Sequence, residues 1–419
     1  MLYLCRIMKF DDYRITPEIK DNLAEMGLKR PTDIQFKSIT PILKGEDVLA
    51  IAQTGTGKTA AFAIPIVHKI QEQKRTGRSE GIKCLVMEPT RELAQQIADT
   101  FERLSRGTKV KTLCVFGGVE QDPQIARLEK GIDILVTTPG RMFDLASQGH
   151  IKLDRVQILV LDEADHMLDL GFIKDIQDVV RMMPKQRQTL FFSATINEKI
   201  KKIAYSLVKG AAIRIQISPK DPVSKNVRHS VAFISMDDKR FFLARLIEEN
   251  PDSKVLVFVR TKVRAERVAK ALERAAVESI TIHGDKDQKD RFAVMKQFRE
   301  GSVQVLIATD VSARGIDIPN VDIVVNYDLP EVPENYVHRV GRTGRGLQKG
   351  RAISFCSLEE KPLLEAIELF TGKPIDLLTI PKGDYQETLL LHNDRPDKLK
   401  AIVDELEKLE ALTKPKRKK

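Results

Sequence analysis

The sequence predicts an α/β protein of two lobes, each a mostly parallel sheet with helices on both faces. Short β-branched apolar runs alternate with segments of helical period, which is the pattern of βαβ units. The alternation pauses once, at a segment that contains Pro219 and Pro222, and then resumes. The length of 419 residues also exceeds that of a typical single domain. We expect a first lobe at 1–208, a linker at 209–228, a second lobe at 229–372 and an extension at 373–419.

In the first lobe, the expected strands are buried apolar runs that cover 48–51, 84–87, 112–116, 133–137, 158–162 and 189–193. The segment 91–105 repeats apolar residues at helical spacing, which predicts a helix with one buried face. A short strand is expected at 212–217, inside the linker.

The second lobe repeats this pattern. Its expected strands cover 229–235, 254–259, 279–283, 303–308, 322–326 and 351–357, and its expected helices 239–249, 262–276, 287–300 and 359–370. A single apolar stripe along 395–412 predicts a short C-terminal helix, which either packs on the second lobe or forms a short coiled-coil seam. A basic tail follows at Thr413–Lys419, with five bases and no acid.

Composition excludes several classes of protein. The net charge of +10 favours a polyanion partner, although a solvated basic tail explains much of the excess equally well. No apolar run approaches the ~18 residues of a membrane span. The four cysteines are widely spaced and form no C-x-x-C pair, so we expect a reducing, cytoplasmic setting without a disulfide or zinc framework.

A glycine-rich loop follows the first expected strand. It consists of Ala52, Gln53, Thr54, Gly55, Thr56, Gly57, Lys58 and Thr59, with Ala52 in place of the first glycine of the strict pattern. Strand, loop and helix in this order predict a phosphate-binding loop, in which backbone N–H groups cradle phosphates. Lys58 is expected to reach the β- and γ-phosphates, and the Thr59 hydroxyl to bind Mg²⁺. The alternative is a structural turn with two glycines.

Acidic residues follow the apolar run at 158–161, namely Asp162, Glu163 and Asp165. Ligands bind beyond the carboxyl ends of parallel strands. Asp162 is therefore expected to hold Mg²⁺ through water, and Glu163 to orient or deprotonate an attacking water. A solvated acidic turn would explain the charges but not their position at the end of a buried strand.

Three arginines flank two glycines at 338–345 in the second lobe. Guanidinium groups bind phosphate oxygens in pairs, and glycine lets the backbone approach closely. A basic surface loop is the alternative. The first lobe, however, offers no obvious arginine finger, and phosphoryl transfer gains greatly from one.

Together these motifs resemble those of the DEAD-box ATP-dependent RNA helicases of superfamily 2, most of all the bacterial RhlE-like group. The resemblance covers about residues 10–370. It implies two RecA-like lobes, ATP and Mg²⁺ as cofactors, and ATP hydrolysis stimulated by RNA and coupled to local, non-processive unwinding. It also implies a cytoplasmic monomer without membrane contacts, which acts on RNA in ribosomal precursors or RNA-decay complexes.

The resemblance also implies roles for single residues. Phe10 stacks on adenine, Gln35 bonds the adenine edge, Asp317 meets the ribose, and Arg342 and Arg345 are the arginine fingers. The implied RNA contacts are Pro89, Thr90, Arg91, Gly117, Gly118, Thr138, Pro139, Gly140, Arg141, Gln288, Arg291 and Thr309. The implied coupling residues are Asp165, Ser193, Thr195 and His338, although Ser193 and Thr195 could simply cap the next helix.

Two other functions are consistent with parts of the pattern. One is an ATP-gated RNA clamp with little turnover, against which the presence of Glu163, Arg342 and Arg345 argues. The other is a DNA-translocating helicase. The acidic motif at 162–165 together with Gln35 favours RNA.

Overall fold

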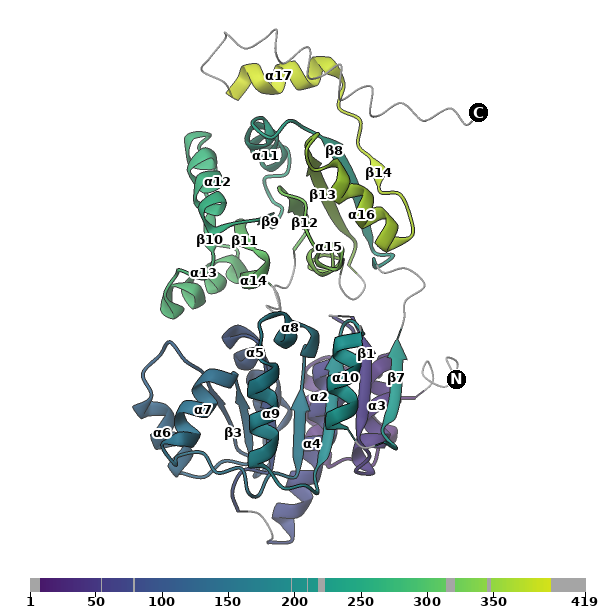
Figure 1. Cartoon of the computed structure of the whole chain (residues 1–419), viewed down its shortest axis with the longest axis vertical. Helices are drawn as coiled ribbons and strands as arrows, with labels where there is room; N and C mark the ends of the chain where they lie inside the picture. The colour runs from purple at the N-terminus through teal and green to yellow at the C-terminus, as the bar shows by residue number, and fades with distance from the viewer. Residues whose placement is uncertain are drawn as a thin grey trace. The chain divides into compact units, whose positions relative to one another are not determined.

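The structure is a computed structural model that describes residues 8–53, 55–77, 80–196, 198–208, 210–217, 223–313, 321–344 and 348–392. The chain divides into two compact units between Ser218 and Pro219. Each unit contains a seven-stranded sheet, and every strand pair among the described residues is parallel (Figure 1). This confirms the predicted fold class.

The first sheet has the strand order β3-β4-β2-β5-β6-β1-β7. Its strands are β1 (Val48–Ala52), β2 (Cys84–Met87), β3 (Thr112–Val115), β4 (Ile134–Thr137), β5 (Ile158–Leu161), β6 (Gln188–Ser193) and β7 (Ile213–Ile217). The helical elements of this unit are η1 (Phe10–Asp12), α2 (Pro17–Glu25), α3 (Asp33–Leu43), α4 (Lys58–Arg75), α5 (Arg91–Leu104), α6 (Asp122–Glu129), α7 (Pro139–Ser147), α8 (Ala164–Asp169), α9 (Ile173–Met182) and α10 (Glu198–Leu207).

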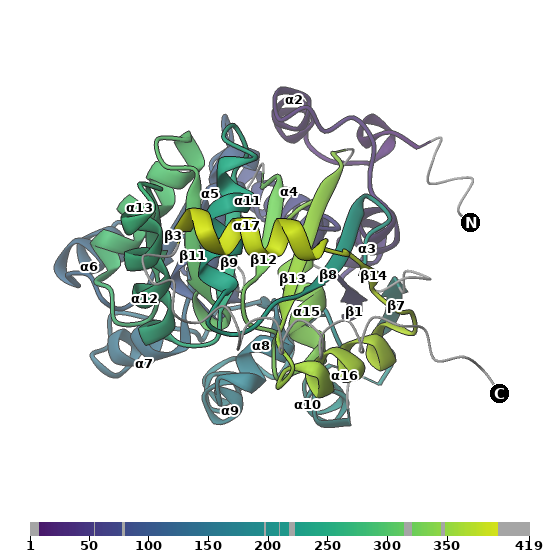
Figure 2. The same cartoon turned by 90° about the horizontal axis from the view of Figure 1, so that it is seen from above.

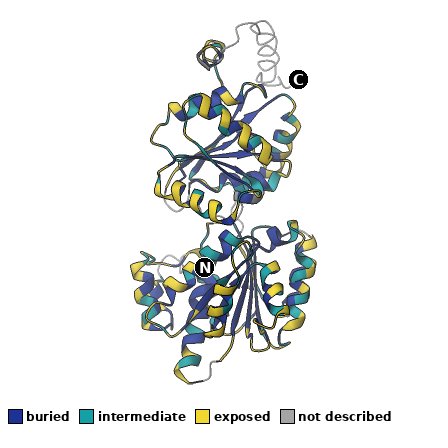
Figure 3. Cartoon of the chain, turned by 90° about the vertical axis from the view of Figure 1, so that its left-hand side faces the viewer, coloured by how far each residue is buried: buried dark blue, intermediate teal, exposed yellow. Residues whose placement is uncertain are grey.

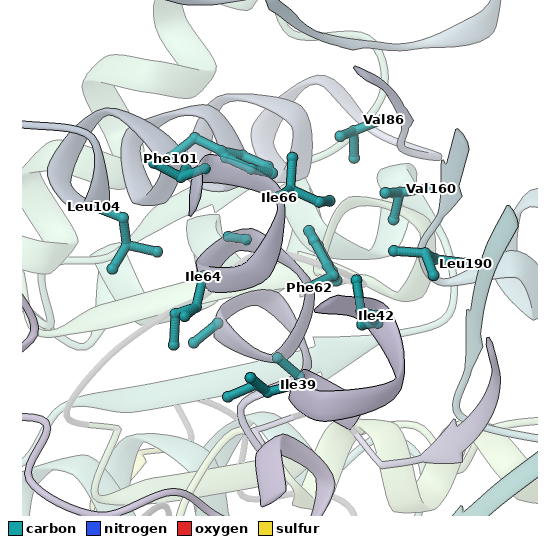
Figure 4. Packing of buried hydrophobic residues seen from close by; sticks show 14 of the residues in the cluster. Ile39, Ile42, Phe62, Ile64, Ile66, Val86, Phe101, Leu104, Val160 and Leu190 are labelled. Atoms are coloured by element: carbon teal, nitrogen blue, oxygen red, sulfur yellow. The ribbon is translucent and has the colours of Figure 1, made fainter. Parts of the chain in front are cut away.

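Helices cover both faces of this sheet, and this explains why its strands are apolar at consecutive positions. Val48 and Ala50 of β1 join a hydrophobic cluster with α2, α3, α4 and α5, whereas Leu49 and Ile51 join one with α6 to α10. Figure 4 shows the first cluster, in which Phe62 of α4 lies among side chains of α3, α5 and the strands. The polar residues of the glycine-rich loop and of the acidic motif follow the ends of β1 and β5.

The second sheet has the order β10-β11-β9-β12-β13-β8-β14. Its strands are β8 (Val227–Phe233), β9 (Val255–Val259), β10 (Ile280–Ile282), β11 (Val305–Thr309), β12 (Ile323–Asn326), β13 (Gly350–Cys356) and β14 (Asp376–Leu377). The helices are α11 (Lys239–Glu248), α12 (Lys262–Arg274), α13 (Gln288–Glu300), α14 (Asp310–Ala313), α15 (Pro333–Val340), α16 (Lys361–Thr371) and α17 (Lys382–His392). One face packs on α11, α12 and α17 and the other on α13, α15 and α16. Figure 3 shows buried strands between helices whose outer sides are exposed.

Two segments differ from the sequence-based expectation. The strand expected inside the linker is β7, which pairs with β1 and so forms an edge of the first sheet. The extension also contributes to the second unit, because β14 pairs with β8 and α17 lies next to α11 (Figure 2). The Tyr385 ring of α17 packs 4.6 Å from the Phe242 ring, and its hydroxyl donates to the Asp238 carboxylate at 2.9 Å. The helix predicted at 395–412 and the basic tail lie outside the described residues.

Candidate functional site

Apart from Phe10 and Gln35, the predicted site residues of the first unit lie where its parallel strands end. The glycine-rich loop follows β1, and Asp162 follows β5. The segments that begin at Pro89 and Thr138 follow β2 and β4, and Ser193 ends β6. Because the strands are parallel, all these ends lie at one edge of the sheet, which is where α/β proteins bind ligands.

The glycine-rich loop is held by the start of α3. The side-chain amide of Gln35 donates from Nε2 to the Gly57 carbonyl at 3.1 Å and accepts from the Thr32 N–H at 2.9 Å. The Thr32 hydroxyl donates to the Thr56 carbonyl at 2.8 Å. Gly57 has φ +91°, and a Cβ there would overlap the Gln35 amide, so only glycine suits this position. Thr54 lies outside the described residues.

Lys58 begins α4 and points a buried ammonium toward the acidic residues. Its Nζ lies 3.9 Å from Asp162 Oδ1, and this nitrogen makes no hydrogen bond to any described residue. A buried ammonium without hydrogen bonds is costly unless a ligand supplies acceptors. Ala52 ends β1, while Gln53, Gly55 and Thr59 complete the described part of the loop. The arrangement fits the phosphates of a nucleotide.

Asp162 and Glu163 are buried at the end of β5. Burial raises the pKa of Asp162 to about 6, with Lys58 opposing the shift and Glu163 adding to it. Glu163 has the left-handed conformation φ 45°, ψ 47°, which is unusual for a residue other than glycine. Such strain costs about 1–3 kcal/mol and is typical of functional positions. Motif reasoning missed His166, whose buried ring nitrogen Nδ1 lies 3.7 Å from Glu163 Oε2.

Asp165 holds the segment after β6. Its Oδ2 accepts hydrogen bonds from the Ala194 N–H at 3.2 Å, the Thr195 N–H at 2.9 Å and the Thr195 hydroxyl at 3.0 Å. The Ser193 hydroxyl donates to the Thr195 carbonyl at 2.7 Å. In the described residues these side chains therefore bond to the acidic motif and to each other. The helix that they could have capped is α10, which begins at Glu198, and Asn197 lies outside the described residues.

Two arginines predicted to contact RNA, Arg91 and Arg141, lie against one loop of the first unit. The Arg91 guanidinium packs against Gly118, which has φ +78° and no room for a Cβ, and it also lies near Gly117. Arg141 Nη2 donates to the Val119 carbonyl at 2.9 Å, which ties α7 to the same loop. Thr90 and Thr138 precede α5 and α7, and Pro89 and Pro139 are buried beside them, whereas Gly140 is exposed.

In the second unit, Thr309 ends β11 and donates to the Ser312 hydroxyl at 3.3 Å, whereas Gln288 and Arg291 lie in the first turn of α13. The Arg342 guanidinium is buried, and its Nε donates to the His338 carbonyl at 3.2 Å. Arg345 and Asp317 lie outside the described residues.

Sequence reasoning gave no separate role to Arg339, which the structure shows as the centre of a buried network. Its Nε and Nη2 donate to the two oxygens of Asp310 at 2.6 and 2.8 Å, and Nη1 donates to the Asp328 carbonyl at 2.6 Å. The arginine pattern at 338–345 was the only signal in the sequence for this network. One of its three guanidinium groups, that of Arg339 in α15, bonds to α14 and to β12 and the segment that follows it.

The surroundings of Phe10 differ from those expected for a ring that stacks on adenine. Its ring is only 3% exposed and packs in the hydrophobic cluster of α2, α3, α4 and α5, with the Tyr13 ring 6.2 Å away. A base could stack on this ring only after part of that packing opened.

Comparisons with known proteins agree with this geometry. Residues 32–203 match the DEAD/DEAH box helicase family, and residues 238–346 match the helicase conserved C-terminal domain. The ATP-dependent RNA helicase CshA of Listeria monocytogenes is 40% identical over 376 residues, which are 90% of this chain and 71% of that protein. The ATP-dependent RNA helicase RhlB of Shewanella oneidensis is 40% identical over 396 residues, 94% of this chain and 89% of that protein.

Solved structures are similar too. S. cerevisiae Dbp5 bound to RNA and ADP BeF3 has a TM-score of 0.80 and 31% identity, covering 91% of this chain and 98% of that one. Mss116 bound to ssRNA and UDP-BeF has a TM-score of 0.82 and 27% identity, and the match covers 95% of this chain and 84% of that one. Among the described residues, no helix is long and apolar enough to cross a membrane. The chain belongs to the DEAD-box family of ATP-dependent RNA helicases.

Proposed function

We propose that this chain hydrolyses ATP at the carboxyl edge of the first sheet, and that RNA stimulates the reaction. The observation that carries the proposal is the buried Lys58 ammonium, which faces Asp162 and has no hydrogen bond to a described residue. Phosphate oxygens supply the missing acceptors. The loop that precedes Lys58 is already held in place by Gln35 and Thr32, so little reorganisation is needed to bind them.

Each residue then has a defined task. The loop amides and Lys58 hold the phosphates, and Glu163 orients the attacking water and accepts its proton. Arg342 and Arg345 would act as arginine fingers, which spread the negative charge of the transition state. Thr59 and Asp162 would hold Mg²⁺, whose charge helps to neutralise the phosphates. The buried carboxylate of Asp162 and the unbonded Lys58 nitrogen fit such a magnesium–nucleotide site.

RNA is proposed to bind through its backbone. The predicted contacts are threonine hydroxyls, glycine loops and the guanidinium groups of Arg91 and Arg141, which favour phosphates and sugars over base edges. Such contacts do not read sequence. Local, non-processive opening of short duplexes is what the family resemblance implies, and we propose it for this chain.

Finer assignments remain proposals. A cytoplasmic monomer and targets in ribosomal precursors or RNA-decay complexes rest on the family resemblance. The domain bounds 1–208, 229–372 and 373–419 rest on the sequence patterns, and the pairing of β7 with β1 and of β14 with β8 extends the two sheets beyond these bounds. The relatives named above are called CshA and RhlB, so membership of the RhlE-like group also stays a prediction.

One experiment separates the proposed helicase from its alternatives. ATP hydrolysis by the full chain is measured without nucleic acid, with single-stranded RNA and with DNA of the same sequence and length. Strong stimulation by RNA alone, together with ATP-dependent separation of a short RNA duplex, is the expected result. RNA binding that needs ATP but proceeds without turnover would instead identify a clamp, and equal stimulation by DNA would identify a DNA-dependent enzyme.

A further inference from the structure

Glu88 is a fully buried carboxylate that no described residue satisfies. It follows β2, its side chain is 0% exposed, and neither Oε1 nor Oε2 has a hydrogen-bond partner in the described part of the chain. Other buried acids of this unit are well bonded, such as Asp165 with three hydrogen bonds and Asp133 with an ion pair to Lys74 at 2.6 Å. Buried polar groups without partners are rare and need an explanation.

The backbone places this carboxylate beside the proposed nucleotide site. β2 pairs with β5 in the register Met87 to Leu161, so Glu88 and Asp162 follow paired residues on neighbouring strands. The Glu88 N–H donates to the Thr137 carbonyl at 2.9 Å, and the Asp162 N–H donates to the Met87 carbonyl at 3.3 Å. The backbone of Glu88 is thus held by the sheet rather than by a mobile loop.

The electrostatic surroundings of Glu88 are those of the same site. Burial raises the pKa of Glu88 well above its usual range, the Asp162 and Glu163 carboxylates raise it further, and Lys58 opposes them. Three carboxyl groups therefore share one ammonium at this buried edge of the sheet. A divalent cation would supply the missing positive charge.

Direct binding of that cation by Glu88 is not supported by the geometry. The described residues contain no group of three His, Cys, Asp or Glu side chains placed to hold a metal ion together. Mg²⁺, however, usually keeps several water ligands and takes only one or two carboxylates from the protein. A carboxylate near the ion can then accept hydrogen bonds from those waters.

We propose that Glu88 is a positioning residue of the magnesium site, which accepts hydrogen bonds from water bound to the cation that Asp162 and Thr59 hold. This inference rests on the proposed function of the site. It assigns to Glu88 a share of the affinity for Mg²⁺, without a share in the chemical step. Outer partners of this kind typically contribute about 10–100-fold to metal affinity.

The test is a titration of the full chain with MgCl₂ in the presence of a fluorescent ADP analogue, so that no turnover is needed. Glu88→Gln keeps the size of the side chain and removes its charge. We expect the Mg²⁺ concentration that gives half-maximal analogue binding to rise by about tenfold. Glu88→Asp keeps the charge on a side chain that is one methylene shorter. Its half-maximal Mg²⁺ concentration should fall between that of Glu88→Gln and that of the unmutated chain.

Two further variants serve as controls. Asp162→Asn should shift the midpoint at least as far as Glu88→Gln, because it changes a proposed ligand. Asp133→Asn also removes a buried carboxylate, but from the opposite edge of the sheet just before β4, and should leave the midpoint unchanged. Thermal unfolding without Mg²⁺ should show Glu88→Gln to be at least as stable as the unmutated chain, because an amide is less costly to bury than a charge.

The outcomes separate this inference from the function on which it rests. A Glu88→Gln midpoint within twofold of the unmutated value, with Asp162→Asn clearly shifted, would overturn the role of Glu88 and leave the magnesium site intact. A loss of thermal stability in Glu88→Gln with an unchanged midpoint would make Glu88 a purely structural residue. Nucleotide binding by the unmutated chain that ignores Mg²⁺ would instead contradict the proposed site itself.

Discussion

Replacing Gln35 by alanine should weaken nucleotide binding, because Gln35 fixes the phosphate-binding loop. The structure gives its amide two hydrogen bonds, one to the Gly57 carbonyl and one from the Thr32 N–H. Only the bond to Gly57 reaches the loop, because the bond from Thr32 caps the start of α3. At about 1 kcal/mol net for one bond, the loop loses about 1 kcal/mol of support. If the free loop then leaves its binding conformation, affinity falls by up to about 5-fold. Binding of a fluorescent ADP analogue measures this directly.

The preference of the Gln35→Ala variant for ATP over GTP should fall as well. One amide N–H and one oxygen lone pair of Gln35 remain for the base after the two bonds to the protein are made. Adenine and guanine differ in the donors and acceptors that they present, so a fixed amide discriminates between them. The relative hydrolysis of the two nucleotides at equal concentration is the readout.

A matched control is available at the other edge of the same sheet. Gln188, at the start of β6, donates from its amide to the Ile42 and Glu46 carbonyls at 3.1 and 2.6 Å. Its Oε1 also accepts from Lys69 Nζ at 2.8 Å. Gln188→Ala therefore loses at least as many bonds as Gln35→Ala, and it should lower thermal stability without changing nucleotide affinity. Equal affinities for Gln35→Ala and the unmutated chain would refute the reasoning, and so would equal losses in both variants.

Three further results are expected. Arg342→Ala should lower kcat far more than it raises the KM for ATP, since an arginine finger acts mainly on the transition state; a change in KM alone would make Arg342 a binding residue. Asp165→Ala removes three hydrogen bonds from the segment at 194–195, so it should lower the free energy of unfolding in a urea titration by about 3 kcal/mol. It should also reduce duplex separation more than ATP hydrolysis. Intact unwinding in this variant would contradict the coupling role of Asp165. Deletion of Thr413–Lys419 should make the slope of log RNA affinity against log salt shallower by roughly 1 to 3 units, with the maximal ATPase rate nearly unchanged, and an unchanged slope would leave the tail as a solubility element.

The sheets could be predicted because their strands are buried on both faces. Runs such as Val48–Ala52 and Ile158–Leu161 are apolar at consecutive positions, and the loops that carry the motifs start where these runs stop. The partner of a strand is not encoded in this way. β7 was expected as a strand, but only its pairing with β1 shows that it belongs to the first sheet. The helix α17 packs through Tyr385 and Leu389 on a helix 130 to 150 residues earlier in the chain, which no local pattern reveals.

The site could be predicted as far as motifs reach, and no further. Glu163 and Asp165 stand out because acids end an apolar run, whereas Glu88 is a single acid between a strand and a proline and carries no local pattern. The proposed role of Glu88 follows from the parallel register that places β2 beside β5. His166 and the contact of Gln35 with Gly57 were missed for a related reason, because both depend on how the chain packs around the end of a strand.

The central claim is that Glu163 is the base for the hydrolysis of bound ATP, which RNA stimulates. Steady-state ATP hydrolysis at saturating RNA, measured beside ATP-dependent RNA binding, tests it in a single pair of proteins, the unmutated chain and Glu163→Gln. The substitution is expected to lower hydrolysis by on the order of 10²-fold or more, because a positioned base is lost, while RNA binding persists or tightens. Hydrolysis at the unmutated rate in Glu163→Gln, or hydrolysis by the unmutated chain that does not respond to RNA, would contradict it.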